Sequence, residues 1–243
     1  DGHVMSPRRE AIGRKQHAAF LRRWCGLFLG VSYSKLMGQR HYLEPSYAFI
    51  KRGCLVEESL ADSKGRVPLD IKIFTFHGRA LLGLVVQDRY GRNTSKLLLD
   101  TQGRVVPGGF ESSYANVILY CSGRVRPLRW LTTPGRFAQI VRFAEQLARA
   151  VAHRHHQVRV DFFANSSHLF FAELTFTTMS CHPGFVPKAL DELLGHVATT
   201  PASHVTSACL RATMEAYYGA PRMCNQHLAP MLLDPWRPAL KPA

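Results

Sequence analysis

Acidic side chains are scarce in this chain of 243 residues, with 17 Asp and Glu against 31 Lys and Arg and a formal net charge of +14. Such a surplus of positive charge favours anionic partners, such as nucleotides, phosphorylated sugars, acidic glycans or nucleic acid. Recognised nucleic-acid-binding motifs are missing, so nucleic acid is the least favoured of these partners. Charge alone does not choose among the others.

Long apolar runs are also missing. The best candidate, Trp24–Val31, is far shorter than the ~18–20 residues of a membrane span. The polar first ten residues lack the apolar stretch of a secretory signal, so we expect a cytoplasmic protein without a membrane span. The six cysteines include no CxxC pair, which disfavours a zinc site of the usual kind. An apolar content of 46% is enough for a packed core of one domain or two small ones.

The clearest structural signals are two hairpins with a helix between them. Residues 70–76 (DIKIFTF) alternate, His77-Gly78 forms a tight turn, and residues 79–88 supply the partner strand. Thr133 and Pro134 indicate the N-cap and first position of a helix that ends near residues 153–155. The second hairpin, QVRVDFFA-NSSH-LFFAELTF, follows directly. Further helices are expected over 11–29, 188–194 and 205–218, with weak strands between 90 and 130.

Two carboxylates lie on the second hairpin, Asp161 and Glu173, with the turn near their midpoint. Antiparallel pairing therefore brings them roughly opposite each other, where they repel unless a cation lies between them. Paired carboxylates suit Mg²⁺, and Thr175, on the same strand face as Glu173, offers a further oxygen. Arg159 shares the face of Asp161, so a structural salt-bridge network is the open alternative.

Lys72 alternates with Ile71 and Ile73 in the first hairpin and is expected on the opposite face. A lysine there is either an ordinary solvated residue or, if another part of the protein covers that face, a phosphate ligand.

Taken together, these segments resemble the TupA-like ATP-grasp family, named for a protein of teichuronopeptide synthesis. The resemblance runs from about Trp24 to Gly195. It rests on the order and spacing of LVEESL, DIKIFTFHGRALLGLVVQDR, FAEQLA, RVDFF and FAELTFT, followed by PGF and LDELLG.

The resemblance implies how a nucleotide is held. In the family, the backbone of a segment after a strand binds the adenine, and an acidic side chain of that segment binds the ribose. The matching residues here are Leu55, Val56, Glu57 and Glu58. Lys72 matches the basic residue that meets the phosphates, and Arg89 is a further candidate for a phosphate or substrate contact.

The resemblance also implies the catalytic set. Asp161, Glu173 and Thr175 match the ligands of Mg²⁺, although many ATP-grasp sites have asparagine where this chain has Thr175. Arg159 is placed to stabilise the transferred phosphoryl group or an acyl phosphate, so Arg159 and Lys72 are the expected catalytic residues.

The implied fold is α+β and ATP-grasp-like, with antiparallel sheets, packed helices and no N-terminal lobe, because the resemblance begins after the family's usual first lysine-bearing strand. The expected division is an N-terminal helix and linker (1–50), a nucleotide-binding core (51–200), and a C-terminal helix with a proline-rich tail (201–243).

The implied function is that of an ATP- and Mg²⁺-dependent carboxylate–amine ligase in cell-surface polysaccharide or glycan-peptide synthesis. Its partners would be a small-molecule or glycan acceptor with a carboxylate, and an amine donor. An ATP-grasp-type kinase and a catalytically degenerate module that binds nucleotide or polyanion are the alternatives. The sequence does not identify the oligomeric state.

Overall fold

The computed structural model describes most of the chain between residues 66 and 219 and scattered positions before it. The described residues are 19, 22–23, 25–26, 29, 51, 53, 57, 59–62, 66–89, 94–106, 108–112, 117–120, 128–133, 135–176 and 184–219.

The chain divides into two compact units. One comprises Asp1–Ala61 with Thr177–His182, and the other comprises Asp62–Phe176 with Pro183–Ala243. In the first unit, the described positions between 19 and 29 have helical backbone, as expected for a helix over 11–29. The expected domain bounds near residues 50 and 200 stay a prediction.

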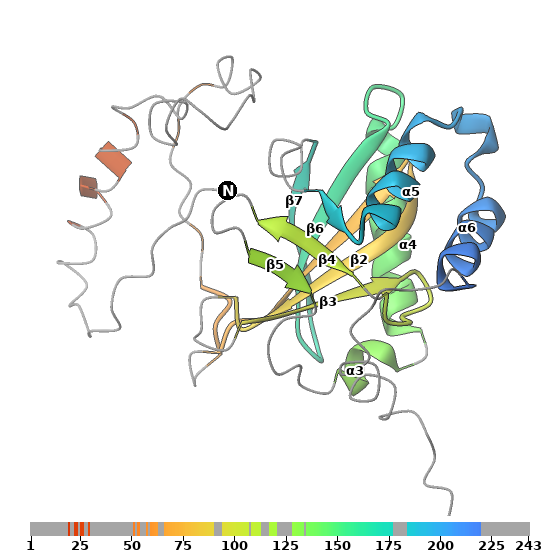
Figure 1. Cartoon of the computed structure of the whole chain (residues 1–243). Coiled ribbons are helices and arrows are strands. Elements are labelled where there is room, and N and C mark those ends of the chain that lie inside the picture. The colour runs from red at the N-terminus through yellow and green to blue at the C-terminus, as the bar shows by residue number, and fades with distance from the viewer. Residues whose placement is uncertain are drawn as a thin grey trace, which may run out of the picture. The chain divides into compact units, whose positions relative to one another are not determined.

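The second unit is built on a five-stranded antiparallel sheet in the order β3-β2-β1-β6-β7 (Figure 1). The strands are β1 Leu69–Phe76, β2 Arg79–Gln87, β3 Ser95–Asp100, β6 Gln157–Ala164 and β7 Leu169–Thr175. Both expected hairpins are therefore present. His77 and Gly78 have φ values of 49° and 76°, the positive values that a two-residue hairpin turn of type I′ requires.

A smaller sheet has the order β5-β4-β8. Its strands are β4 Gly109–Ser112, β5 Val117–Tyr120 and β8 Phe185–Val186. β3, β4 and β5 account for the weak strands expected between residues 90 and 130.

The described helices are α3 Arg129–Thr132, α4 Arg136–Val151, α5 Lys188–Thr199 and α6 Ser207–Gly219, with a 3-10 turn at Ala202–His204. The predicted start of α4 was wrong. Gly135, with φ 96°, is the N-cap, and the Thr133 hydroxyl instead donates a hydrogen bond to the Arg129 carbonyl at 2.6 Å. None of the helices within the described ranges has the length and apolar character needed to cross a membrane.

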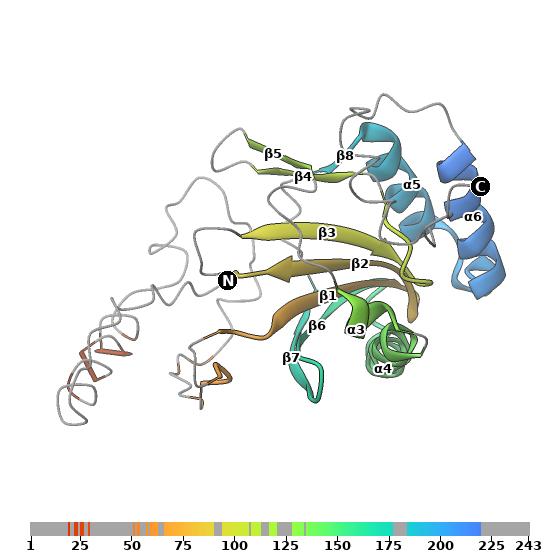
Figure 2. The ribbon, with the colours of Figure 1, turned by 90° about the horizontal axis from the view of Figure 1, so that it is seen from below.

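Helices cover both faces of the five-stranded sheet, with α4 on one side and α5 and α6 on the other (Figure 2). The alternation of β1 decides which side chain meets which layer. Ile71 and Ile73 pack in the core that α4 closes, whereas Phe74 and Phe76 pack with Leu190 and its neighbours from α5 and α6. Each face thus buries its own apolar cluster.

Candidate functional site

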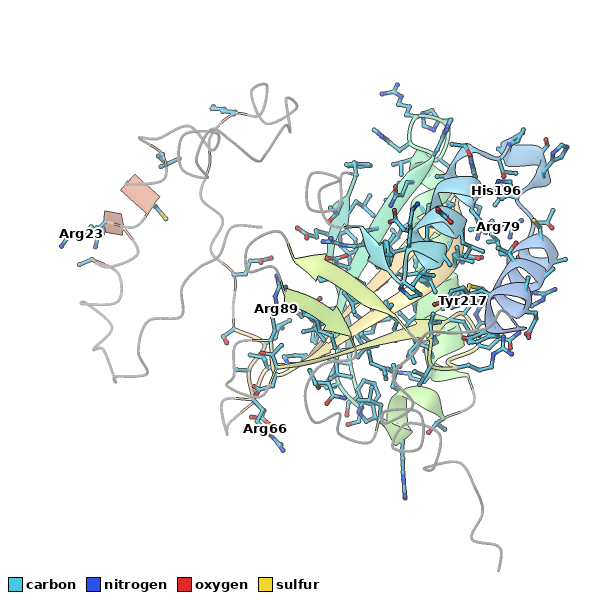
Figure 3. The ribbon with its side chains drawn as sticks, in the orientation of Figure 1. Arg23, Arg66, Arg79, Arg89, His196 and Tyr217 are labelled. Carbon is cyan, nitrogen blue, oxygen red and sulfur yellow. The ribbon has the colours of Figure 1, made fainter. Side chains whose placement is uncertain are left out.

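The face of the sheet under α5 changes from apolar to charged part-way along β1. Phe76 and Phe74 lie in the apolar cluster, and Phe74 meets Phe185 edge-to-face at 5.3 Å. Lys72 and Asp70 continue the same alternation beyond that cluster. Arg89, just past β2, lies at the end of the sheet away from α6, whose Tyr217 marks the other end (Figure 3).

We call the polar end of this face the charged face. It is formed by Asp70 and Lys72 from β1, Arg89 after β2, Lys96 from β3, Arg159 and Asp161 from β6, and Glu173 and Thr175 from β7.

The register places the two predicted carboxylates together. Asp161 is paired with Glu173 across β6 and β7, and Lys72 is paired with Asp161 across β1 and β6. The pairing of β6 with β7 shifts between Asp161 and Phe162. Irregularities of this kind re-aim side chains and are common next to functional sites.

Arg159 is the centre of the contacts at the β6–β7 end. Its Nε lies 2.7 Å from Asp161 Oδ1 and its Nη2 lies 2.8 Å from Asp161 Oδ2. The same Nη2 donates to Thr175 Oγ1 at 3.0 Å and to Glu173 Oε1 at 3.3 Å. The side chain of Arg159 is 4% exposed, so these contacts are made largely out of water.

Lys72 joins this group to Asp70. Its Nζ lies 2.7 Å from Asp161 Oδ2 and 3.0 Å from Asp70 Oδ1, and its side chain is 12% exposed. Arg89 Nη1 lies 2.7 Å from Asp70 Oδ2. The salt-bridge alternative raised by the sequence is therefore realised: the cations Lys72, Arg89 and Arg159 each contact at least one of the carboxylates.

Burial and neighbouring charges have opposite effects on the pKa values of Asp161 and Arg159. Burial of Asp161 disfavours its ionised form, but the hydrogen bonds from Arg159 and the charges of Lys72 and Arg159 hold its pKa below the usual value. Burial likewise acts to lower the pKa of Arg159, and its hydrogen bond to Asp161 with the nearby carboxylates raises it instead. Both groups are charged at neutral pH.

The lowered pKa of Asp161 gives stability a pH dependence. An unfolded aspartate titrates at about 3.9, so between that pH and the lower folded pKa of Asp161 the unfolded chain binds more protons than the folded one. The contribution of Asp161 is complete above about pH 4 and is lost as the pH falls through the lower folded pKa. We expect the unfolding free energy to fall over this acid range, and to fall less steeply in Asp161→Asn; equal slopes in urea titrations at stepped pH would contradict this.

The arrangement also bears on whether Mg²⁺ fits. The three predicted ligands converge, since Asp161 Oδ2, Thr175 Oγ1 and Glu173 Oε1 all contact one atom, Nη2 of Arg159. Hard oxygen donors on one point are the right chemistry for Mg²⁺. The guanidinium of Arg159 occupies that point, so the three oxygens can bind the ion only when the Arg159 side chain adopts another conformation. The metal role stays a prediction, and the described part of the chain contains no group of three or more His, Cys, Asp and Glu side chains that could hold a metal.

The predicted nucleotide contacts have different outcomes. Lys72 and Arg89 lie on the charged face with the predicted metal ligands. Leu55, Val56 and Glu58 lie outside the described residues. Glu57 is exposed and belongs to the unit formed by Asp1–Ala61 and Thr177–His182, so its role in binding ribose stays a prediction.

Two members of the charged face were given no role by sequence reasoning. Asp70 is buried and accepts from both Lys72 and Arg89. Its position two residues before Lys72 on the same strand was a usable signal. Lys96 directly precedes the apolar run Leu97–Leu99 of β3. Because β3 was only weakly indicated by the sequence, the face on which Lys96 lies could not be assigned.

The comparison with protein families agrees with the resemblance stated above. A sequence model of the TupA-like ATP-grasp family matches residues 32–199, a range that includes every member of the charged face. Searches of curated proteins and of solved structures returned no match. The α+β architecture, with its five-stranded antiparallel sheet and packed helices, agrees with this assignment. Because the match covers well over half of the sequence, the chain belongs to the TupA-like ATP-grasp family.

Proposed function

We propose that this protein is an ATP- and Mg²⁺-dependent carboxylate–amine ligase. The observation that carries the proposal is the convergence of Asp161, Glu173 and Thr175 on one point of the charged face, with Arg159 and Lys72 alongside. Membership of the ATP-grasp family supports ATP as the energy source. The TupA-like resemblance supports an acceptor carboxylate on a cell-surface polysaccharide or glycan-peptide.

Asp161, Glu173 and Thr175 would hold Mg²⁺, which when bound neutralises phosphate charge and orients the phosphates. Arg159 must leave its place among the three oxygens to admit the ion. A guanidinium released beside the phosphates is suited to the charge that develops on the transferred phosphoryl group. Lys72 and Arg89 supply positive charge for the rest of the phosphate chain.

The reaction itself needs no protein nucleophile. The acceptor carboxylate displaces ADP from the γ-phosphate of ATP and forms an acyl phosphate. An amine then attacks the acyl carbon, an amide forms, and inorganic phosphate leaves with the loss of a proton from the amine. The chain has to hold these groups in line and supply positive charge.

The test is calorimetric titration of the full chain with ATP, once with excess Mg²⁺ and once with a chelator. We expect saturable binding of ATP with Mg²⁺ and at least tenfold weaker binding without Mg²⁺. Without the ion, the negatively charged triphosphate is repelled by the carboxylates of Asp161 and Glu173. An absence of binding at millimolar ATP with Mg²⁺ would contradict the proposal.

A kinase that stops at phosphoryl transfer would bind ATP in the same way, and product analysis separates the two: the ligase yields an amide and free phosphate, the kinase a phosphorylated acceptor. The net charge of +14 favours a third candidate, a module that binds polyanions. Such binding would weaken steeply with salt and would not require Asp161.

A further inference from the structure

Positive and negative charges are distributed unevenly across the charged face. At the β6–β7 end, Arg159 lies against Asp161 and Glu173. At the β1–β3 end, Lys72, Arg89 and Lys96 surround one carboxylate of this face, Asp70. Lys72 is shared, because it also contacts Asp161. The excess of positive charge therefore lies on the side of β3.

The excess of positive charge comes from Lys96, because Lys72 and Arg89 are both paired with Asp70. Lys96 is paired with Val86 of β2, which is paired with Asp70 of β1, so all three side chains share one face of the sheet. Lys96 is half-buried, and within the described part of the chain its ammonium has no ion pair or hydrogen bond. Burial and then repulsion from Lys72 and Arg89 lower its pKa, and attraction to Asp70 offsets only part of this.

An arrangement of this kind opposes the stability of the folded chain. Two of the three cations are anchored by Asp70, and the third is held close to them with partial loss of its hydration. Nothing in the packing of β3 requires a lysine at this position, since the neighbouring Leu98 on the same face is apolar and buried. Positions that cost stability in this way are common at binding sites, where a ligand supplies the missing charge.

We propose that Lys96, together with Lys72 and Arg89, forms a subsite for a phosphate or carboxylate group of a ligand, on the β3 side of the charged face and joined to the Asp161–Glu173 pair through Lys72. β3 lies three strand positions from β6, which corresponds to about 14 Å between their backbones. The charged face thus presents two regions of different charge, one rich in carboxylate and hydroxyl oxygens at β6–β7 and a cationic one at β1–β3. Either a phosphate of the nucleotide or the acidic group of the acceptor can supply the anion, and identifying which one rests on the proposed function.

The test compares three forms of the full chain: wild type, Lys96→Gln, and Lys188→Gln. Lys188 is an exposed lysine of α5 that pairs with Glu192 and so matches the change of charge at a distant place. Inorganic phosphate is titrated into each form and followed by NMR at low ionic strength. We expect wild type and Lys188→Gln to bind phosphate alike, and Lys96→Gln to bind it at least tenfold more weakly.

Thermal unfolding without ligand gives an independent readout. Removing an unpaired ammonium from beside two other cations should raise the midpoint of Lys96→Gln by about 2–4 °C, and added phosphate should raise the midpoint of wild type more than that of Lys96→Gln. Equal phosphate affinity in all three forms, or undetectable binding in wild type, would overturn the proposal.

A titration with ATP and Mg²⁺ then distinguishes the two sources of the anion. If the nucleotide supplies it, Lys96→Gln also binds ATP at least tenfold more weakly; if the acceptor supplies it, ATP affinity is unchanged while phosphate affinity falls. Phosphate binding that depends on Lys96 in a chain that does not bind ATP would support the subsite and reject the ligase proposal. ATP binding with no effect of Lys96 on phosphate would do the reverse.

Discussion

Replacing Asp161 with asparagine is expected to eliminate Mg²⁺-dependent ATP binding and to lower the unfolding free energy by about 3–5 kcal/mol. The loss of stability follows because Asp161 is 3% exposed and neutralises two cations, Arg159 and Lys72, that are themselves largely buried. Asparagine keeps the shape but removes the charge, so both cations are left without their shared partner. The loss of binding follows because an amide oxygen is a weaker ligand for Mg²⁺ than a carboxylate.

Asp100→Asn is the matched control. Asp100 is another buried aspartate that contacts an arginine, with Arg104 Nε at 2.6 Å, but it lies near α6 rather than on the charged face. Both variants should lose stability in urea titrations, and only Asp161→Asn should lose ATP binding. If Asp161→Asn binds ATP and Mg²⁺ like wild type, the metal role assigned to Asp161 is wrong.

A double variant tests whether Asp161→Asn loses ATP binding only because it unfolds. Adding Arg159→Met to Asp161→Asn removes the buried guanidinium that the first change leaves uncompensated. We expect the double variant to be more stable than Asp161→Asn alone, because an apolar side chain in place of a buried ion often costs little. A well-folded double variant that still fails to bind ATP would separate the binding defect from the loss of stability.

Arg159→Met by itself is expected to change two measurements in opposite directions. Turnover with ATP should fall on the order of 10³-fold, the lower end of the effect of removing an arginine that stabilises a transferred phosphoryl group. Binding of Mg²⁺ without nucleotide should become about tenfold tighter, equivalent to ~1.4 kcal/mol. The second effect is expected because Nη2 of Arg159 lies among the three oxygens that the ion would use.

Arg104→Met is the control for this variant, since Arg104 also bridges two carboxylates, Asp100 and Glu215, at 2.6 and 2.7 Å. It should leave both measurements unchanged. Stability should fall less in Arg159→Met than in Asp161→Asn, because Lys72 still contacts Asp161. Weaker binding of Mg²⁺ by Arg159→Met would contradict the idea that arginine and ion compete for one position.

Local patterns were sufficient to predict the two hairpins, β1–β2 and β6–β7, that supply most of the charged face. The alternation of residues 70–76 predicted Lys72 opposite Ile71 and Ile73, and the turn near the midpoint of the second hairpin predicted Asp161 beside Glu173. Both predictions are confirmed because side-chain direction in a strand repeats every two residues and hairpin register follows from its turn.

Predictions that depended on a single boundary or a weak strand succeeded less well. The N-cap of α4 is Gly135 rather than the predicted Thr133. Gly135 has a positive φ, which glycine adopts readily, and residue patterns of helix N-termini do not reveal such a backbone conformation. Lys96 and Asp70 received no role, because their nearness depends on the pairing of β3, β2 and β1 rather than on any one segment.

The sequence by itself determined the strand alternation, the facing carboxylates and the family to which the chain belongs. Only the tertiary structure decided that Arg159 lies among the metal-type oxygens and that Lys96 joins two other cations. The physical reason is that a side chain's face is a local property of the strand, whereas the partner of a charge depends on which strands are neighbours, where the β6–β7 register shifts, and how much water remains at each position.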